Sequence, residues 1–376
     1  MSDWLQKIHA LSNTNSPCVL VTVAHTAASA PREAGTRMVV AASDVYGTIG
    51  GGNLEFKAIE TARHLLGDSK KLAAENFLEV YALGSMLEQC CGGVVFLHYE
   101  LLEPGNSGWV DILHELAQNS VSAVTVTRTG EQDAGYSSSE KLIVTEFETH
   151  GSLGELDEAA IVQARNLIDQ KNSNSQSLLQ SLSSPTAKRS LPDIKDALLF
   201  DLVPACDFHI VLFGAGHVGS AIVNVLEKSL DCRINWVDSR EHVFPETLAD
   251  SVTKNQSSMP TNIVGDMPAN SFYLVMTHNH ALDLALCEAI LKRDNFQYLG
   301  LIGSETKRKR FRKQLKAKQI SDKGLSRMTC PIGVNGIASK EPGAIAVSVV
   351  AQLLQIYEHN KQLKTEEQGG NNVISL

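Results

Sequence analysis

The feature that most constrains this chain is a spaced glycine triplet in its second half, within FHIVLFGAGHVGSAIVNVLEKSL. Gly214, Gly216 and Gly219 separate an apolar run, typical of a buried strand, from a segment with helical spacing. Such glycines allow a tight turn, close approach of a pyrophosphate to the backbone, and close packing of helix on strand. The next predicted strand, CRINWVDSR, ends in Asp238, whose carboxylate would accept a hydrogen bond from a ribose hydroxyl. The spacing predicts a Rossmann-like domain, and NAD(P) binding stays an open hypothesis because this fold serves many functions.

Two later strand patterns end in polar residues. NSFYLVM leads into a Thr-His-Asn-His stretch that contains His278 and His280, and FQYLGLI is followed by Gly303 and Ser304. In an open parallel sheet, ligands bind outside the carboxyl ends of the strands, so we expect these residues to share a crevice with the glycine turn. A His-x-His pair also suits a metal, but we favour histidines that contact a ligand. The basic run 307–313 is interpreted as a solvated helix face, and its N-terminal end would suit a phosphate in this acidic protein.

Composition narrows the class of protein. The chain has 376 residues, 43% of them hydrophobic and 20% charged, which suits two globular domains. A net charge of −9 argues against a nucleic-acid partner, which would require a basic surface. The N-terminus lacks a secretory pattern, and no stretch reaches the roughly 18 apolar residues of a membrane span. Seven scattered cysteines suit a reducing compartment, so we expect a cytoplasmic protein.

The first half contains a degenerate internal repeat. VSAVTVTRT (121–129) is similar to CVLVTVAHT (18–26), and in both places a strand, a Gly-[Ser/Thr]-[Leu/Ile]-Gly turn and an Ala-Arg-bearing helix follow. The polar segment beyond the second copy is typical of a linker. We therefore predict an α/β fold with an N-terminal repeat domain at 1–168, a linker at 169–205, a Rossmann-like parallel-sheet domain at 206–360 and a flexible tail at 361–376.

Several motifs together resemble one family. They are PCVLVTVAHTAASAPREAGTRMVV, GTIGGGNLE, QCCGG, HIVLFGAGHVG, MTHNHALD, GLIGSETKRKRF and CPIGVNGI. This set is similar to the XdhC/CoxI family, the accessory proteins of xanthine dehydrogenase and related molybdenum hydroxylases. The resemblance covers nearly the whole chain, most clearly residues 17–100 and 208–355. The chain departs from the family pattern at Ala28, Glu88, Asn53 and the Asn335-Gly336-Ile337 stretch.

The resemblance implies a role as a carrier. Such proteins bind molybdenum cofactor, a molybdopterin with a dithiolene and a terminal phosphate. They hold it while a cysteine desulfurase partner replaces an oxo ligand by sulfide, and they deliver it to the molybdenum subunit of xanthine dehydrogenase. They are not expected to turn over a metabolite themselves. A homodimer would suit a protein that must shield its cargo. The alternative is an NAD(P)-dependent oxidoreductase that uses the Rossmann fingerprint.

A glycine loop in the first copy is the first candidate contact with that cofactor. Gly50, Gly51, Gly52 and Asn53 precede a predicted helix, and consecutive glycines cost chain entropy that a simple turn does not require. Backbone N–H groups at a helix start favour an anion, so we expect this loop to hold the pterin or its phosphate. Arg32 would add a charge-assisted contact, and a nearby acid, Glu55, is expected to cap the helix.

The stretch QCCGG is the second candidate contact. Cys90 and Cys91 either pack as small apolar residues or supply a thiolate to molybdenum, and either one of them would be the ligand. The following Gly92 and Gly93 would let a bulky ligand approach the backbone, and Gln89 would hydrogen-bond the pterin or an oxo ligand.

Overall fold

The structure is a computed structural model that describes residues 3–67, 75–84, 92–105, 108–169, 177–182 and 192–369. The chain divides into two compact units, Met1–Ala205 and Cys206–Leu376, and each is described by itself. The mixed α/β fold class expected from the sequence is confirmed, with antiparallel sheets in the first unit and a parallel sheet in the second. No helix in the described part of the chain is long and apolar enough to cross a bilayer.

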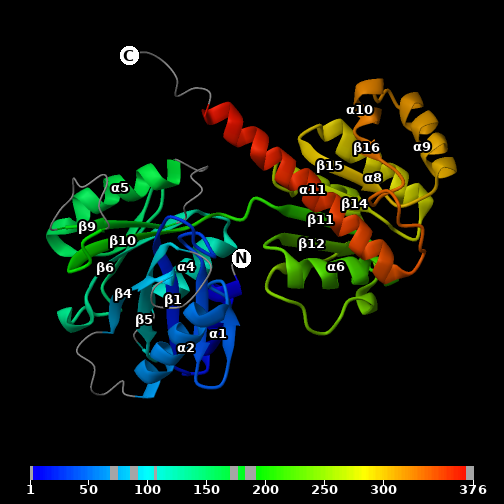
Figure 1. The fold of residues 1–376 in the computed structure, drawn as a ribbon. Coiled ribbons are helices and arrows are strands. Elements are labelled where there is room, and N and C mark those ends of the chain that lie inside the picture. Colours follow the sequence, from blue (N-terminus) through cyan, green and yellow to red (C-terminus); the bar gives the residue numbers. More distant parts are fainter. Residues whose placement is uncertain are drawn as a thin grey trace, which may run out of the picture. The chain divides into compact units, whose positions relative to one another are not determined.

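The first unit consists of two copies of one supersecondary arrangement (Figure 1). The first copy comprises α1 (Asp3–Asn13), β1 (Cys18–Ala27), β2 (Arg37–Ala41), β3 (Val45–Gly47), α2 (Gly52–Gly67), β4 (Asn76–Ala82) and β5 (Val94–Leu102). The second comprises α4 (Gly108–Gln118), β6 (Ala123–Gly130), β7 (Lys141–Val144), β8 (Thr149–Gly151), α5 (Asp157–Asp169), β9 (Ser177–Ser181) and β10 (Asp196–Val203). Single turns of 3-10 helix lie at Gln132–Ala134 and Gly154–Leu156.

The strand orders confirm the internal repeat. They are β3-β2-β1-β5-β4 in one sheet and β8-β7-β6-β10-β9 in the other, so each strand has its counterpart at the same place. All the neighbouring strands in both sheets are antiparallel. Even the turn after the third strand is repeated, because Gly47 and Gly151 both have φ +79°. Two sequences that have diverged this far therefore still specify one chain path.

The predicted linker or surface excursion at 169–205 is wrong for residues 177–181 and 196–203. Residues 177–181 and 196–203 are strands β9 and β10, which pair with each other, and β10 also pairs with β6. The physical reason is that these strands are short and their flanks are rich in Ser, Asn and Pro, so composition outweighed a weak alternation. They are the counterparts of β4 and β5 in the first copy.

Each copy has an apolar core of its own. Helix α2 packs on one face of its sheet through residues that include Leu54, Ala58 and Leu65. Helix α5 packs in the same way on the second sheet through Ala160, Ala164 and Ile168. The other faces of the two sheets meet in a mixed cluster of side chains from both copies: Ala24, Leu78, Phe96, Leu179, Ala197 and Leu199.

A polar network lies in the same interface and crosses between the copies. Arg37, the first residue of β2, forms an ion pair with Asp201 of β10 at 2.7 Å. Lys141, the first residue of β7, forms an ion pair with Glu100 of β5 at 3.0 Å. All four side chains are at least nine-tenths buried.

Aromatic residues complete this network with the same symmetry. The Arg37 guanidinium lies 4.6 Å from the ring centre of Trp4 in α1, and the Lys141 ammonium lies 4.5 Å from that of Trp109 in α4. The two helices also contact each other, because the rings of His9 and His114 stack at 3.8 Å. The pairs Trp4/Trp109 and His9/His114 occupy corresponding positions of α1 and α4.

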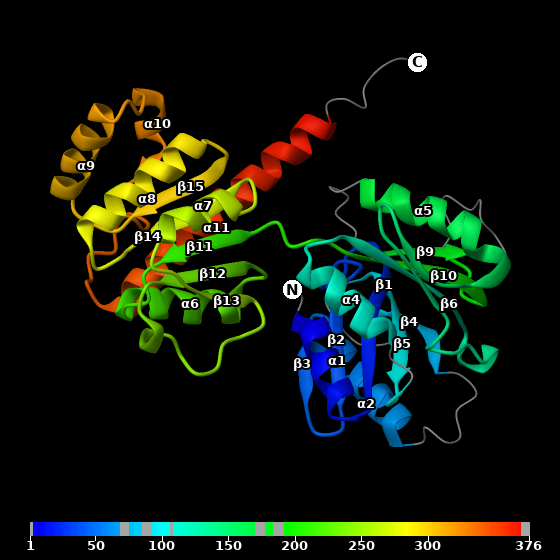
Figure 2. The same ribbon diagram turned by 180° about the vertical axis from the view of Figure 1, so that it is seen from behind.

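The second unit is a six-stranded parallel sheet with the order β13-β12-β11-β14-β15-β16 (Figure 2). Its strands are β11 (His209–Phe213), β12 (Arg233–Asp238), β13 (Val252–Gln256), β14 (Ser271–Val275), β15 (Phe296–Leu301) and β16 (Met328–Thr329). Its helices are α6 (His217–Ser229), α7 (Pro260–Asp266), α8 (His280–Arg293), α9 (Glu305–Ala317), α10 (Asp322–Ser326) and α11 (Pro342–Gly369), with a 3-10 turn at Glu241–Val243. Numbered from β11, the strand order is 3-2-1-4-5-6, which is the dinucleotide-binding arrangement.

Alternate side chains of the central strands supply two separate cores. Val211, Phe213 and Val275 pack under the layer that contains α8 and α9, whereas Ile210 and Leu212 pack under α6 and α11. Helix α11 continues to Gly369, so the flexible tail predicted from residue 361 is wrong for residues 361–369. The polar composition of this helix end resembles that of a tail.

We expect Lys141→Met to destabilise the first unit by about 3–5 kcal/mol, because it leaves the Glu100 carboxylate buried without its cation. The measurement is the free energy of unfolding from urea titration. Adding Glu100→Gln should recover most of the loss, since the remaining groups are neutral. Equal stability of wild type and Lys141→Met would show that the pair carries no such constraint.

Candidate functional site

Three of the loops singled out in the sequence meet at one end of the first sheet. Gly93, just before β5, is so close to the end of β1 that an added Cβ would lie 2.3 Å from the carbonyl oxygen of Ser29. A Cβ on Gly50 would lie 2.8 Å from Pro31 Cβ and 3.3 Å from Arg32 Cγ. The 27–32 segment therefore contacts both the glycine loop and the glycines that follow the cysteine pair. Side chains at these two glycines would separate the three loops.

The glycine loop is anchored by hydrogen bonds to Glu55, a residue of the helix that follows it. Gly50, Gly51 and Gly52 have φ values of +123°, +73° and +66°. The Glu55 carboxylate accepts hydrogen bonds from the amides of Ile49 and Gly51, both at 3.0 Å.

The hydroxyl of Thr48 donates to the same carboxylate oxygen of Glu55 at 2.5 Å. Partial burial opposes ionisation of Glu55, but the hydrogen bonds from Thr48 and the loop amides together hold its pKa below the usual range. The capping role predicted for Glu55 agrees with these contacts. Because that carboxylate already takes the amides of Ile49 and Gly51, an anion would have to be bound by the rest of the loop, toward Gly52, Asn53 and the exposed Arg32.

Ala28, one of the departures from the family pattern, has a strained backbone conformation. Its φ is +60°, in the left-handed region that glycine adopts without strain and that costs an L-residue about 1–2 kcal/mol. The expected glycine of the relatives would fit this backbone directly. The chain keeps the conformation and bears the strain, because the following Ser29 carbonyl lies against Gly93.

The thiols themselves lie outside the described residues. Gln89, Cys90 and Cys91 fall in the undescribed 85–91 segment, so their predicted contacts with pterin and molybdenum stay predictions. Gly92 and Gly93 are described, and a Cβ on Gly92 would meet open space. At Gly93 the close neighbour is the backbone of Ser29, and the approach of a ligand to these two glycines stays a prediction.

The Rossmann fingerprint adopts its expected geometry. Gly214 has φ +118°, and a Cβ on it would lie 2.4 Å from the carbonyl oxygen of Met276, after β14. A Cβ on Gly219 would lie 2.2 Å from the Gly214 carbonyl oxygen, so this glycine lets α6 pack on the turn. Gly216 precedes α6 and has open space around it. The turn thus leaves room for a pyrophosphate at the helix start, as the sequence predicts.

Asp238 is already fully engaged. Its Oδ2 accepts from the amide of Ala215 at 2.7 Å and from Arg240 Nη2 at 2.9 Å. Its Oδ1 accepts from the amide and Nε of Arg240, both at 3.0 Å. Burial opposes its charge, yet these bonds lower its pKa to about 2. A ribose hydroxyl would have to displace Arg240 to reach this carboxylate.

A cavity of about 460 Å³ opens at the carboxyl ends of β14 and β15. His280, Gly303, Ser304 and Arg310 are among its lining residues, so the predicted grouping of the histidine stretch with the Gly303–Ser304 turn is correct for His280. Arg310 Nη2 lies 3.3 Å from His280 Nδ1. Since a guanidinium only donates, Nδ1 of His280 accepts in this contact.

His278 is exposed and does not line that cavity. Among the described residues, no group of three or more His, Cys, Asp and Glu side chains is arranged to hold a metal ion. The paired-histidine metal site, which we ranked second, therefore gains no support in this part of the chain.

Lys307 also lines this cavity, which the sequence did not predict. Lys307 was assigned to a solvated face, yet its ammonium donates to Asp283 at 2.7 Å and to the Ile302 carbonyl at 2.8 Å. Asp283 is completely buried and also accepts from the hydroxyl of Thr277 at 2.7 Å. A lysine at the third position of a helix whose first turn follows a strand end faces back toward that edge. The position of Lys307 in the helix therefore indicated this contact, but the neighbouring basic residues favoured the interpretation as a solvated face.

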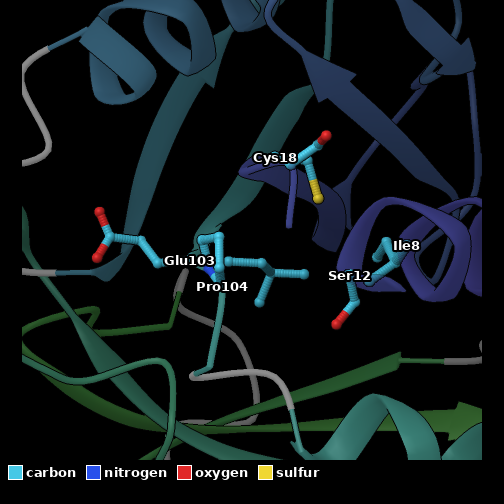
Figure 3. A pocket seen from close by; sticks show the side chains of 7 residues that line it. Ile8, Ser12, Cys18, Glu103 and Pro104 are labelled. Carbon is cyan, nitrogen blue, oxygen red and sulfur yellow. The ribbon is translucent and has the colours of Figure 1, made fainter. Parts of the chain in front are cut away.

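A smaller cavity lies beside Cys18 in the first unit, with a volume of about 10 Å³ (Figure 3). The sulfur is near Ile8, Ser12 and Pro104, in a setting that is mostly apolar. Burial, together with the nearby Glu100 charge, raises the pKa of the Cys18 thiol to about 12. This protonated thiol is unsuited to metal binding or nucleophilic attack.

The fold and the loops together define a class: a duplicated antiparallel-sheet unit with convergent glycine loops, joined to a Rossmann unit. Two family models match the chain, one described as the XdhC and CoxI family over residues 11–76 and one as the XdhC Rossmann domain over 210–353. The chain belongs to the XdhC and CoxI family.

Two individual proteins are similar to this chain. A stretch of 153 residues is 31% identical to the uncharacterized protein YqeB of Escherichia coli strain K12, and it covers 39% of this chain and 27% of that relative. The match thus spans about a quarter of the length of YqeB. A crystal structure of a protein described as a xanthine dehydrogenase from Bacillus halodurans has a TM-score of 0.68 and 19% identity, and the match covers 96% of this chain and 97% of that one. At this identity the likeness establishes the shared fold.

We expect Gly93→Ala to destabilise the first unit by about 1–3 kcal/mol, because the new methyl group must push the 27–29 backbone away. Gly92→Ala is the matched control, since its Cβ meets open space, and it should change stability by less than about 0.5 kcal/mol. Thermal or urea unfolding measures both. Equal effects of the two substitutions would contradict the close approach of the loops.

Proposed function

We propose that this chain is an accessory protein of a xanthine dehydrogenase or a related molybdenum hydroxylase. In this proposal it binds molybdenum cofactor, protects it during sulfuration and delivers it to the molybdenum subunit of the apo-hydroxylase. Family membership and the shared fold of the Bacillus halodurans protein support the choice of client enzyme. The observation that carries the proposal is the meeting of the 27–32 segment with both Gly50 and Gly93.

The proposed cargo suits the chemistry of these loops. Molybdopterin ends in a phosphate, and the outer glycine loop with the exposed Arg32 offers backbone donors and a permanent cation. The dithiolene end carries molybdenum, a metal that favours sulfur ligands, and the chain places Cys90 and Cys91 just before Gly92. One loop would therefore hold the phosphate while the other meets the metal.

The partners follow from the same proposal. A cysteine desulfurase would be the source of the sulfur atom that replaces the oxo ligand, and the hydroxylase would receive the product. Both exchanges require the cargo to be held reversibly, so the chain needs no turnover of a metabolite. A homodimer in the cytoplasm would shield the cargo between these exchanges.

The test is complementation of a host strain that lacks this gene. Without the chain, xanthine dehydrogenase protein should accumulate in an inactive form that lacks sulfurated cofactor, and the wild-type gene should restore its activity. We expect Arg32→Ala to retain about tenfold to a hundredfold less cofactor, because one charge-assisted contact with the phosphate is lost. Cofactor copurified with the chain is measured as its fluorescent oxidation product.

Arg63→Ala is the matched control for this variant. Arg63 is also exposed, but it lies on α2 and is not among the residues that contact the glycine loop. It should behave as wild type in both measurements. Normal hydroxylase activity in the deletion strain would overturn the proposal, and equal retention by the two arginine variants would remove Arg32 from the site.

A nucleotide site in the Rossmann unit is the second candidate, and the open space around Gly216 favours it. We expect purified protein to bind NAD(P) in calorimetric titration, and Gly216→Val to weaken that binding at least tenfold by filling the space for the pyrophosphate. Gly265→Ala is the control, since its added Cβ also meets open space but lies in α7. Failure of wild-type protein to bind either NAD or NADP would dismiss this site and the oxidoreductase alternative.

A further inference from the structure

A small cavity lies between the two repeats of the first unit. Trp4 and Glu100 from the first repeat and Trp109 and Asp201 from the second are among its lining residues. The space open to the centre of a water molecule is about 10 Å³, which is room for roughly one water. Lys141 also lines this space, and Asp201 forms its ion pair with Arg37.

Four polar atoms of the lining residues lack a hydrogen-bond partner among the described residues. They are the two indole nitrogens, Trp4 Nε1 and Trp109 Nε1, and two carboxylate oxygens, Glu100 Oε1 and Asp201 Oδ1. Each oxygen lies within ion-pair distance of its cation, but the hydrogen bonds of Lys141 and Arg37 go to the other oxygen of each carboxylate. Trp4 is partly exposed as a residue, but all four of these atoms are themselves buried, so bulk water does not supply the missing partners.

These atoms form a complementary set: two donors from α1 and α4, and two acceptors from β10 and β5. A water molecule accepts two hydrogen bonds and donates two. An ion suits the space less well, because a cation would meet Arg37 and Lys141 and an anion would meet both carboxylates. His98 also lines the cavity, and its burial, with the nearby Lys141 charge, lowers its pKa to about 3, so it adds no charge.

We propose that one ordered water molecule occupies this cavity and bridges the two repeats. It accepts hydrogen bonds from the indole N–H groups of Trp4 and Trp109 and donates to Glu100 and Asp201. Each repeat contributes one donor and one acceptor, so the water lies on the pseudo-two-fold axis that relates the copies. An empty cavity would leave both indole N–H groups without an acceptor and both carboxylate oxygens without a hydrogen bond, which native interiors avoid.

The three tryptophans of the chain make a direct test feasible. In deuterated protein with ¹⁵N-labelled tryptophan, the spectrum contains three indole N–H signals. We expect water cross-peaks of opposite sign in NOE and ROE spectra for Trp4 and Trp109, the signature of a long-lived bound water. Trp236 is the internal control, because its indole donates to the Gly214 carbonyl at 3.2 Å and should show none.

Trp4→Phe and Trp109→Phe assign the signals, and a crystal structure supplies a second measurement that needs no variant. That structure should show one water peak within hydrogen-bond distance of both indole nitrogens and both carboxylates. Water contact at the two indoles together with this peak supports the proposal. Absence of the contact in the wild-type protein, or an empty cavity in the crystal, overturns it.

Discussion

The first unit depends on two buried ion pairs that cross between its repeats. A buried cation is tolerated only where a carboxylate faces it, and here Arg37 and Lys141 each find that carboxylate in the other copy. Neither copy can bury the start of its second strand alone without leaving a charge unpaired. The apolar cores under α2 and α5 belong to single copies, but the layer between the sheets belongs to both. The repeats are therefore one folding unit, although the sequence repeats as two.

This shared interior leaves the loops at the sheet ends free to differ. The first copy has three consecutive glycines, Gly50, Gly51 and Gly52, and its 27–32 segment contacts this loop. The second copy retains the strands, the turn and the helix. The residues that the two copies share thus stabilise the core, and the glycine loop in which they differ is where the proposed cargo would bind.

Much of this architecture could be predicted from the chain itself. The Rossmann unit followed from the spacing of three glycines and the alternation of strands and helices, because those patterns report local backbone needs. Strands β9 and β10 were missed, since their flanks are polar and their partners lie far away in sequence. The crossed ion pairs were missed for a related reason: Lys141 reads as an ordinary strand-end lysine until the Glu100 carboxylate comes to face it. Long-range pairing is a property of the assembled sheets. The W-x-x-x-x-H-x-L pattern shared by α1 and α4 was the one available hint.

The turn that follows the third strand in each repeat reveals how a side chain sets the reach of a loop. In the first repeat, the Glu55 carboxylate accepts hydrogen bonds from the Thr48 hydroxyl and the Ile49 amide, seven and six residues before it. In the second, the Asp157 carboxylate accepts hydrogen bonds from the Ser152 hydroxyl and the Leu153 amide, five and four residues before it. The longer acid spans the longer loop, and the shorter acid spans the loop that has lost two residues. Glu and Asp differ by one methylene group. Exchanging one acid for the other thus lets the same two hydrogen bonds form in loops that differ in length by two residues.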